Sequence, residues 1–413
     1  MGTRTVTRRN LPGLVGGLAA AAALPAGVLV STRTFAKTYD PGASDTEVKL
    51  GQPVPYSGPA SFYSGIGKAV LAYFKMLNDE KGGINGRKII VVSLDDGYNP
   101  PKVVEVTRKM VEQDEVLAIF GISGTASSAS VQRYLASKKV PQLFGFSGVS
   151  LFGDPQRSPW SVGFMPSYDF EGSTYGRFIH DNIKDPKVAL LYQNDDFGKA
   201  MLAGVRKGLA DKADTIVKQV SYEVTDPTVD PQVITLADTG ANVLVLIATP
   251  KATSQAIRKS ADIGWNPLKI VQTGTASIVS VLTPAGLDKS VGVVAGKFLK
   301  DYSDPAWAND PGMQIYAAFM KKYAPDLDPN DNLVVLGYTV AQAMAHVVKQ
   351  CGDELTRENV LKQACSLDKL NSDMLLPGIT LNTSPDNRFP VRQLRTARFD
   401  GTKWQLFGEL LTE

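Results

Sequence analysis

The sequence predicts an α/β protein in which doubly wound parallel sheets are covered by helices on both faces. Two observations indicate this fold. Segments with strand character alternate with segments of helical period from residue 48 to residue 272, and this alternation is typical of parallel sheets because each helix returns the chain to the start of the next strand. Residues 88–94 and 243–247 are almost continuous in β-branched and aliphatic side chains, as expected of strands buried on both faces.

The expected elements follow from the spacing of the apolar residues. Apolar positions three and four apart over 66–77 predict a helix, which Gly82-Gly83 ends. Pro101 favours the start of the next helix because proline suits the first helical turn. The expected strands cover residues 48–54, 88–94, 116–120, 142–146, 188–192, 215–222, 243–247 and 269–272. The expected helices cover residues 66–77, 101–113, 127–137, 173–182, 198–212, 229–239 and 253–263.

Beyond about residue 291 the pattern changes to long helices followed by short strands. Helical stretches are expected over 313–323, 333–349 and 356–364, the last with Thr356 as its N-cap. Residues 391–399 and 403–407 are expected to pair as a hairpin. Asp400-Gly401 lies between them, and this dipeptide favours a primed turn.

Residues 1–36 have the anatomy of an export signal. They contain Arg4, Arg8, Arg9 and Arg33 and no acidic residue, and the apolar run 11–30 carries no charge. Thr34-Phe35-Ala36 is a suitable cleavage site, which would make Lys37 the mature start. The string around Arg8-Arg9 resembles a twin-arginine signal, and a general secretory signal is the alternative. No cysteine lies near the exit for lipid attachment, so we expect a cleaved, periplasmic protein.

The charge balance excludes nucleic acid as an expected partner. The 413 residues contain 44 basic and 41 acidic side chains, a formal net charge of +3. Four of the basic residues and none of the acidic ones lie in the signal, so the remaining chain is nearly neutral. A nucleic-acid-binding protein normally shows a concentrated basic surface instead.

Export also affects the interpretation of Cys351 and Cys365, the two cysteines of the chain. In an oxidising compartment the two are expected to form a disulfide. The bond would tie the helix over 356–364 to the end of the preceding helix. Two free buried thiols are the alternative.

Motifs for catalysis or metal binding are missing. His180 and His346, the two histidines, both fall in predicted helices, and neither has an evident nucleophile as partner. Asp95-Asp96 and Asp195-Asp196 stand at strand ends, where turns and helix caps favour aspartate, and no regular spacing of oxygen ligands follows them. We therefore expect a binding protein rather than an enzyme, with no metal and no cofactor.

Five strings in order resemble the Leu/Ile/Val-binding group of periplasmic substrate-binding proteins of ABC importers. They are residues 54–59 (VPYSGP), 81–87 (KGGINGR), 95–100 (DDGYNP), 139–143 (KVPQL) and 194–198 (NDDFG). The resemblance extends from about residue 47 to residue 410. It implies a type I periplasmic binding protein, with two α/β lobes joined by three crossing segments and a small-molecule ligand held between the lobes by hinge closure. It also implies a membrane permease as the partner, and we expect a monomer.

The same resemblance implies the lobe boundaries. Lobe one would contain residues 45–166 and 298–377, and lobe two would contain residues 167–297 and 378–413. The chain would cross near Pro166, Phe298 and Pro377.

Candidate ligand contacts follow from the fold and from the resemblance. Ser123 and Thr125 stand between a strand and a helix, where free N–H groups at a helix N-terminus favour an anion, although they could serve only as a helix cap. Thr125 matches the family's carboxylate-binding hydroxyl. The resemblance further implies contacts in lobe one and in the matching loops of lobe two: Tyr63, Phe146, Ser147, Gly148, Tyr168 or Asp169, Phe197, Thr249 and Thr275.

One departure from the family pattern affects the expected ligand. Amino-acid binders of this family carry an acidic residue about where Thr275 stands, and it pairs with the ligand's ammonium. Residues 272–277 hold no carboxylate here, and a buried ammonium needs one. We therefore expect a carboxylate without an α-ammonium, such as an aromatic or short aliphatic acid. A branched-chain amino acid or an amide is the alternative, and a sensor lobe or a secreted enzyme is the more remote one.

Overall fold

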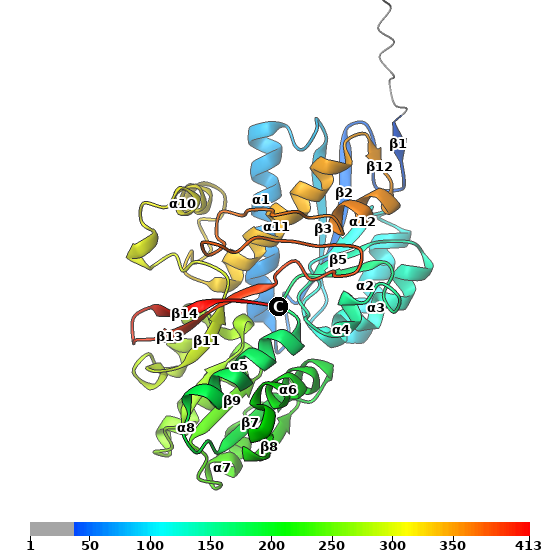
Figure 1. The fold of residues 1–413 in the computed structure, drawn as a ribbon. Coiled ribbons are helices and arrows are strands. Elements are labelled where there is room, and N and C mark those ends of the chain that lie inside the picture. The colour runs from blue at the N-terminus through cyan, green and yellow to red at the C-terminus, as the bar shows by residue number, and fades with distance from the viewer. Residues whose placement is uncertain (1–36) are drawn as a thin grey trace, which may run out of the picture. The chain divides into compact units, whose positions relative to one another are not determined.

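The computed structural model describes residues 37–413 (Figure 1). The predicted export signal lies outside the described residues. Within residues 37–413 the main strands form two separate sheets, each in its own lobe. No helix in this part of the chain has the length and apolar character needed to span a membrane.

Lobe one is built on a five-stranded parallel sheet in the order β3-β2-β4-β5-β6. Its strands are β2 (Glu47–Val54), β3 (Lys88–Asp95), β4 (Ala118–Phe120), β5 (Gln142–Gly145) and β6 (Ser161–Gly163). Its helices are α1 (Ser64–Lys81), α2 (Pro100–Glu112), α3 (Thr125–Ser137), α4 (Ser150–Gly153), α10 (Pro311–Tyr323), α11 (Asn332–Cys351) and α12 (Arg357–Ala364). A short parallel pair, β1 (Thr38–Tyr39) with β12 (Glu354–Leu355), lies beside it.

Helices cover both faces of this sheet, which confirms the doubly wound prediction. Val48 and Leu50 share a large apolar core with α1 and α11, whereas Val116 and Ile119 share a second core with α2 and α3. Alternate residues of a strand point to opposite faces, so one strand set supplies both cores.

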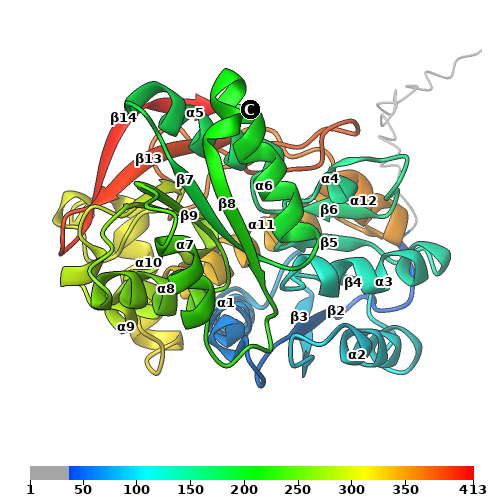
Figure 2. The ribbon, with the colours of Figure 1, turned by 90° about the horizontal axis from the view of Figure 1, so that it is seen from below.

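Lobe two has a seven-stranded sheet in the order β14-β13-β11-β10-β9-β7-β8. Its parallel strands are β7 (Val188–Gln193), β8 (Ile216–Tyr222), β9 (Val243–Ile247), β10 (Leu268–Val271) and β11 (Val294–Lys297). The antiparallel hairpin of β13 (Gln393–Phe399) and β14 (Trp404–Thr412) extends it through β11. Its helices are α5 (Tyr168–Asn182), α6 (Asp196–Leu209), α7 (Asp230–Ala237), α8 (Pro250–Asp262) and α9 (Thr283–Ala285). Figure 2 shows α5 and α6 on one side of the sheet and α7 and α8 on the other.

Glycines allow α5 and α6 to pack unusually close together. A Cβ atom on Gly176 would lie 2.2 Å from the carbonyl oxygen of Val205, and one on Gly208 would lie 2.1 Å from that of Ser173. Only a residue without a side chain fits such contacts. This pairing holds the start of α5, where the chain enters lobe two, firmly against α6.

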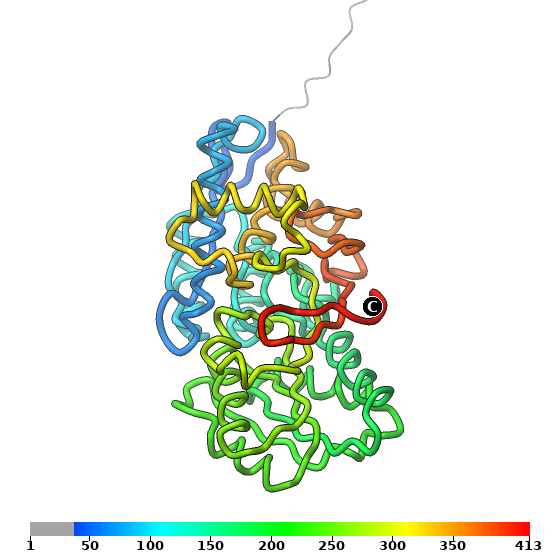
Figure 3. The backbone as a smooth tube through the Cα atoms, turned by 90° about the vertical axis from the view of Figure 1, so that its left-hand side faces the viewer, coloured from blue at the N-terminus to red at the C-terminus, as the bar shows by residue number. Residues whose placement is uncertain are grey.

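The C-terminal segment enters lobe two further along the sequence than expected. Arg388 donates hydrogen bonds to the carbonyls of Ser158, Pro159 and Ser161, and Gly163 donates to the carbonyl of Arg388. The segment that ends at Phe389 therefore runs along β6 of lobe one, and the chain enters the sheet of lobe two at Gln393 rather than near residue 377. Figure 3 shows the C-terminal hairpin at the level where the two lobes meet.

Two local predictions are wrong. The predicted disulfide is absent among the described residues, since Cys351 and Cys365 are free thiols. Both pack in the apolar core of lobe one, where burial raises the pKa of Cys351 to about 12. The hairpin turn is also not a two-residue primed turn, because Phe399 pairs with Trp404 and leaves a four-residue loop. In this loop the Asp400 carboxylate accepts hydrogen bonds from Thr402 and Lys403, and Gly401 has the positive φ.

Candidate functional site

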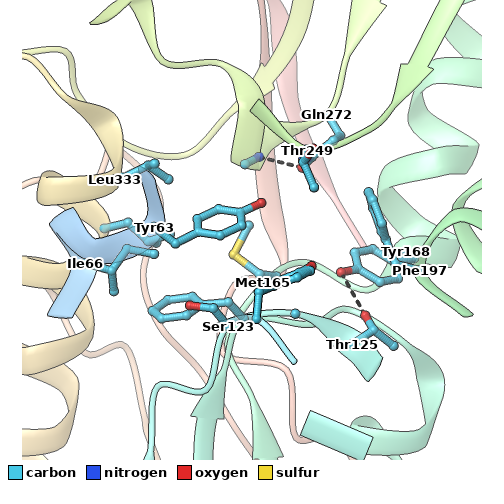
Figure 4. Close-up of a pocket in the computed structure, with 15 residues that line it drawn as sticks. Tyr63, Ile66, Ser123, Thr125, Met165, Tyr168, Phe197, Thr249, Gln272 and Leu333 are labelled. Carbon is cyan, nitrogen blue, oxygen red and sulfur yellow. Dashed lines mark hydrogen bonds between the residues drawn. The ribbon is translucent and has the colours of Figure 1, made fainter. Parts of the chain in front are cut away.

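A cavity lies between the lobes, at the carboxyl ends of the parallel strands. Lobe one lines it with Tyr63, Ile66, Tyr98, Ser123, Gly124, Thr125, Phe146, Leu333 and Leu336; the first crossing segment adds Met165; and lobe two adds Tyr168, Phe197, Thr249, Gln272 and Gly274. Figure 4 shows Ser123 and Thr125 on one side, Thr249 and Gln272 on the opposite side, and Tyr63 and Met165 between them.

The lobes enclose this cavity tightly. Its free volume is about 50 Å³, whereas ligand pockets usually measure roughly 300–1,000 Å³. A ligand can therefore enter only after the lobes separate or the aromatic side chains turn away. The two lobes, which are linked by crossing segments, are therefore in a closed arrangement.

The N-terminus of α3 faces the cavity without a side-chain cap. Its N-cap residue, Gly124, has a φ of +91° and cannot supply a capping side chain. The Thr125 hydroxyl lies 2.8 Å from that of Ser147 and 3.4 Å from that of Tyr168. Ser123 is 2% exposed, and its hydroxyl has no partner among the described residues. Free N–H groups of the first turn, the helix dipole and these hydroxyls together favour an anionic group.

Two aromatic pairs face the cavity, one from each lobe. In lobe one Tyr63 and Tyr98 stack with centroids 5.9 Å apart and planes at 28°. In lobe two Tyr168 and Phe197 lie 5.1 Å apart at 54°. Burial raises the pKa of Tyr168 to about 12, so its hydroxyl is neutral at physiological pH. These rings provide flat, uncharged surfaces for a ligand body.

Tyr98 reaches the cavity through a constrained loop. Its backbone is left-handed, with a φ of +57°, and its N–H donates to the Asp96 carboxylate at 2.8 Å. Its ring lies against Gly124, where an added Cβ would come within 2.6 Å of the ring. Gly124 is thus needed both for the turn into α3 and for the place of Tyr98.

Neutral polar groups form the wall in lobe two. The side-chain Oε1 of Gln272 accepts from the Gly274 N–H at 2.6 Å, and its side-chain Nε2 lies 3.4 Å from the Ala248 carbonyl oxygen. Thr249 is held by the Tyr222 hydroxyl. Among the described residues that line the cavity, none carries a charge. Asp195, a nearby carboxylate, caps α6 through the Gly198 N–H and accepts from Gln193, and burial raises its pKa.

The structure brings together seven predicted contacts: Tyr63, Ser123, Thr125, Phe146, Tyr168, Phe197 and Thr249. Ser147 stands behind Thr125 as its hydrogen-bond partner. Two other predicted contacts require correction. Asp169 is exposed and pairs with Lys207 at 2.6 Å, and Thr275 is fully buried and donates to the Gln272 backbone carbonyl.

Gly148 is a third correction, because it serves the crossing between the lobes. The Tyr168 N–H donates to its carbonyl at 2.8 Å, and a Cβ there would lie 2.1 Å from the Pro166 carbonyl oxygen. The chain can enter lobe two here only past a residue without a side chain.

Several lining residues were not predicted. Tyr98 and Gln272 follow strand ends, so the rule that places ligands at the carboxyl ends of strands could have found them. Leu333 and Leu336 come from the start of α11, far along the chain, and carry no local signal. His180 hydrogen-bonds Asp181 and Asp211 at the surface, and neither it nor His346 lines the cavity.

The adjacent carboxylates of Asp95 and Asp96 have opposite environments. Burial alone would raise the pKa of Asp95, but hydrogen bonds from Lys102 and Ser57 outweigh it and lower that pKa. Asp96 is fully buried, and one of its oxygens has no partner among the described residues. Burial, with a smaller contribution from the Asp95 charge, raises the pKa of Asp96 to about 6.

Asp96→Asn tests this environment. A folded-state pKa above the ordinary 3.8 means that Asp96 stabilises the fold most below pH ~4 and loses this contribution as the pH rises through about 6. Asparagine keeps the oxygen that accepts from Tyr98, so we expect Asp96→Asn to be more stable at pH 7 by roughly 1–3 kcal/mol and to flatten the pH dependence between pH 4 and 6. Urea unfolding across this range measures both effects. Asp196→Asn, in the matching loop of lobe two, controls for loss of a charge; an unchanged slope in Asp96→Asn would contradict the assignment.

Comparison with known proteins agrees with this geometry. The family model described as periplasmic binding protein matches residues 47–403. The Leu/Ile/Val-binding protein homolog 1 of Brucella suis is 24% identical over 324 residues, which cover 77% of this chain and 82% of that protein.

Two solved structures illustrate the fold. A branched chain amino acid ABC transporter from Thermus thermophilus with bound valine superposes with a TM-score of 0.80 at 17% identity, covering 90% of this chain and 98% of that one. A fatty acid ABC transporter substrate-binding protein from Thermomonospora curvata gives 0.75 at 21% identity, covering 91% and 95%. With two lobes, a cavity between them and a family match over nearly all of the described residues, this chain belongs to the type I periplasmic binding protein family.

Proposed function

We propose that this chain is the solute-binding component of an ABC importer and captures a small carboxylate that lacks an α-ammonium. The observation that carries the proposal is the pairing of an uncapped helix N-terminus on one side of the cavity with an uncharged wall on the other. The first favours an anion, and the second offers no partner for a cation.

The hydrogen-bonding groups of lobe two support the exclusion of ammonium. An ammonium group only donates and needs acceptors that are charged or at least free. The side-chain oxygen of Gln272 already accepts from the Gly274 N–H, so it offers an ammonium at most one uncharged acceptor site. Each Asp195 oxygen accepts a hydrogen bond within lobe two, and Asp195 does not line the cavity.

The body of the ligand is proposed to be flat or short. Two aromatic pairs, one from each lobe, line the cavity, together with Met165, Ile66 and two leucines. An aromatic or short aliphatic acid suits this lining because its apolar part is removed from water while its carboxylate meets α3.

A branched-chain amino acid or an amide is the second candidate. The relatives named for leucine, isoleucine and valine binding and the neighbour with bound valine favour an amino acid. The neighbour named for fatty acid transport favours an acid without an ammonium.

Thr125→Ala tests the carboxylate contact. We expect calorimetry of the purified chain with benzoate, phenylacetate, butyrate, leucine and valine to find an acid that binds more tightly than either amino acid. Loss of a hydroxyl that donates to a carboxylate should weaken that acid about ten- to a hundredfold. Thr125→Ser keeps the hydroxyl and should stay within about threefold. Equal affinity of wild type and Thr125→Ala would remove Thr125 from the site.

Gln272→Glu tests the missing ammonium partner. A carboxylate at this position would supply the charged acceptor that the cavity lacks, so the ratio of leucine affinity to acid affinity should rise about tenfold or more. Gln272→Met, which adds no charge, is the control. A tight amino-acid complex in the wild type, left unaffected by Gln272→Glu, would support the second candidate instead.

The proposal places the mature protein in the periplasm as a monomer that delivers its ligand to a membrane permease. The basis is the signal-like segment before Lys37. N-terminal sequencing of exported protein should find a start at or near Lys37, and a secreted chain that still begins at Gly2 would contradict it.

A further inference from the structure

Gln52 is a buried amide without partners. It lies on β2, is fully buried, and neither its Oε1 nor its Nε2 has a hydrogen-bond partner among residues 37–413. Val48 and Leu50, which precede it in steps of two on the same strand face, belong to the apolar core. An amide at this place destabilises the protein unless something satisfies it, because a buried unpaired polar group loses its hydration.

The fold can satisfy a buried glutamine on the same sheet. Gln142 on β5 is 2% exposed. Its Nε2 donates to the Ser128 carbonyl at 2.8 Å, and its Oε1 accepts from the Ser161 hydroxyl at 3.2 Å. Gln52 is as buried as Gln142 but lacks such partners among residues 37–413.

Gln52 does not itself line the ligand cavity, but it lies near Phe146, which does. Its Nε2 is 3.2 Å from the point that a Cβ on Gly121 would occupy, and the Cε2 atom of Phe146 is 3.8 Å from the same point. Phe146 lines the cavity and pairs with Ser123 through an isolated parallel bridge. Ser123 also lines the cavity and has an unpartnered, buried hydroxyl. Three unpartnered polar atoms, two on Gln52 and one on Ser123, therefore belong to residues that neighbour Phe146.

We propose that Gln52 and Ser123 form a polar subsite of the cavity, beside Phe146, that binds an uncharged hydroxyl group of the ligand. This inference rests on the proposed function and narrows the ligand to a hydroxylated carboxylic acid. An amide offers one acceptor and two donors, and a hydroxyl can donate to the first and accept from the second. A second carboxylate would meet Oε1 with the same charge sign, and an ammonium would leave Nε2 unsatisfied. Phe146 must turn aside for the hydroxyl to reach Gln52.

The test compares acids that differ by one hydroxyl. Calorimetry is run with benzoate against its 2-, 3- and 4-hydroxy isomers, and with butyrate against 3-hydroxybutyrate. For wild type we expect one hydroxy acid to bind about tenfold more tightly than its parent. Gln52→Leu should remove this gain, a loss of roughly tenfold for the hydroxy acid, while the parent acid stays within about twofold. Gln52→Met, with an unbranched side chain of the same length, should behave like Gln52→Leu.

Gln142→Leu is the matched control, and thermal unfolding without ligand is the second measurement. Removing the satisfied amide of Gln142 should lower Tm, whereas Gln52→Leu should leave Tm unchanged or raise it. A drop in Tm of equal size in both variants would mean that the fold satisfies Gln52, and would overturn the inference. A hydroxyl gain that persists in Gln52→Leu, or no gain in wild type, would overturn it too. If none of these acids binds wild type, the proposed function fails and the subsite fails with it.

Discussion

The carboxyl ends of the parallel strands of two sheets meet at one cavity, and the rest of the site depends on this constraint. Tyr63, Tyr98, Ser123 and Phe146 each follow a strand of lobe one, and Phe197, Thr249 and Gln272 each follow a strand of lobe two. In a parallel sheet all these loops open on the same edge. The two edges can meet because the chain crosses between lobes beside Gly148, where a side chain would collide with Pro166. The order of strands and the absence of one Cβ thus decide which residues become neighbours.

Long, regular features of the chain could be predicted from sequence. β9 has the predicted bounds, and Thr356 and Asp195 cap their helices as expected of such residues before a helix. β6 and β11, with three and four residues, are too short to show a period. The late entrance of the C-terminal segment into lobe two depends on Arg388 reaching three carbonyls of the β6 region, and no local pattern reports such a contact.

The same limit applies to the site. Thr125 could be predicted because it follows a predicted strand and precedes a predicted helix, whereas Phe197 came from the family resemblance alone. Asp169 and Thr275 lie in loops near the cavity, but the side chain of Asp169 points to solvent and that of Thr275 points into the protein. The position of a residue in a loop does not determine the direction of its side chain. Leu333 lines the cavity because α11 packs along α1, which is a consequence of the tertiary core. Cys351 and Cys365 pack as apolar side chains in the core of lobe one, so the short distance between them in the sequence did not predict whether they form a disulfide.

The described residues that line the cavity combine hydrogen-bonding capacity with an absence of charge. Gln272 and Thr249 are held by their own loops and by Tyr222, which fixes which of their atoms faces inward. Such preorganised neutral groups discriminate by geometry, since a misplaced ligand group leaves them unpaired. An aliphatic lining of the same size has no hydrogen-bonding groups to leave unpaired, so it would not penalise a wrong ligand in this way. Selectivity here comes from the free-energy cost of polar groups that a wrong ligand leaves without partners.

The tight enclosure of the cavity also has a kinetic consequence. With about 50 Å³ free between the closed lobes, a bound molecule can leave only when the lobes separate or the aromatic side chains turn away. The residence time of a ligand then depends on how often the lobes separate, and contacts that the ligand makes with both lobes slow this separation. A substitution at a crossing, such as one at Gly148, can therefore change dissociation without touching the ligand, and a membrane partner that pulls the lobes apart would control release in the same way.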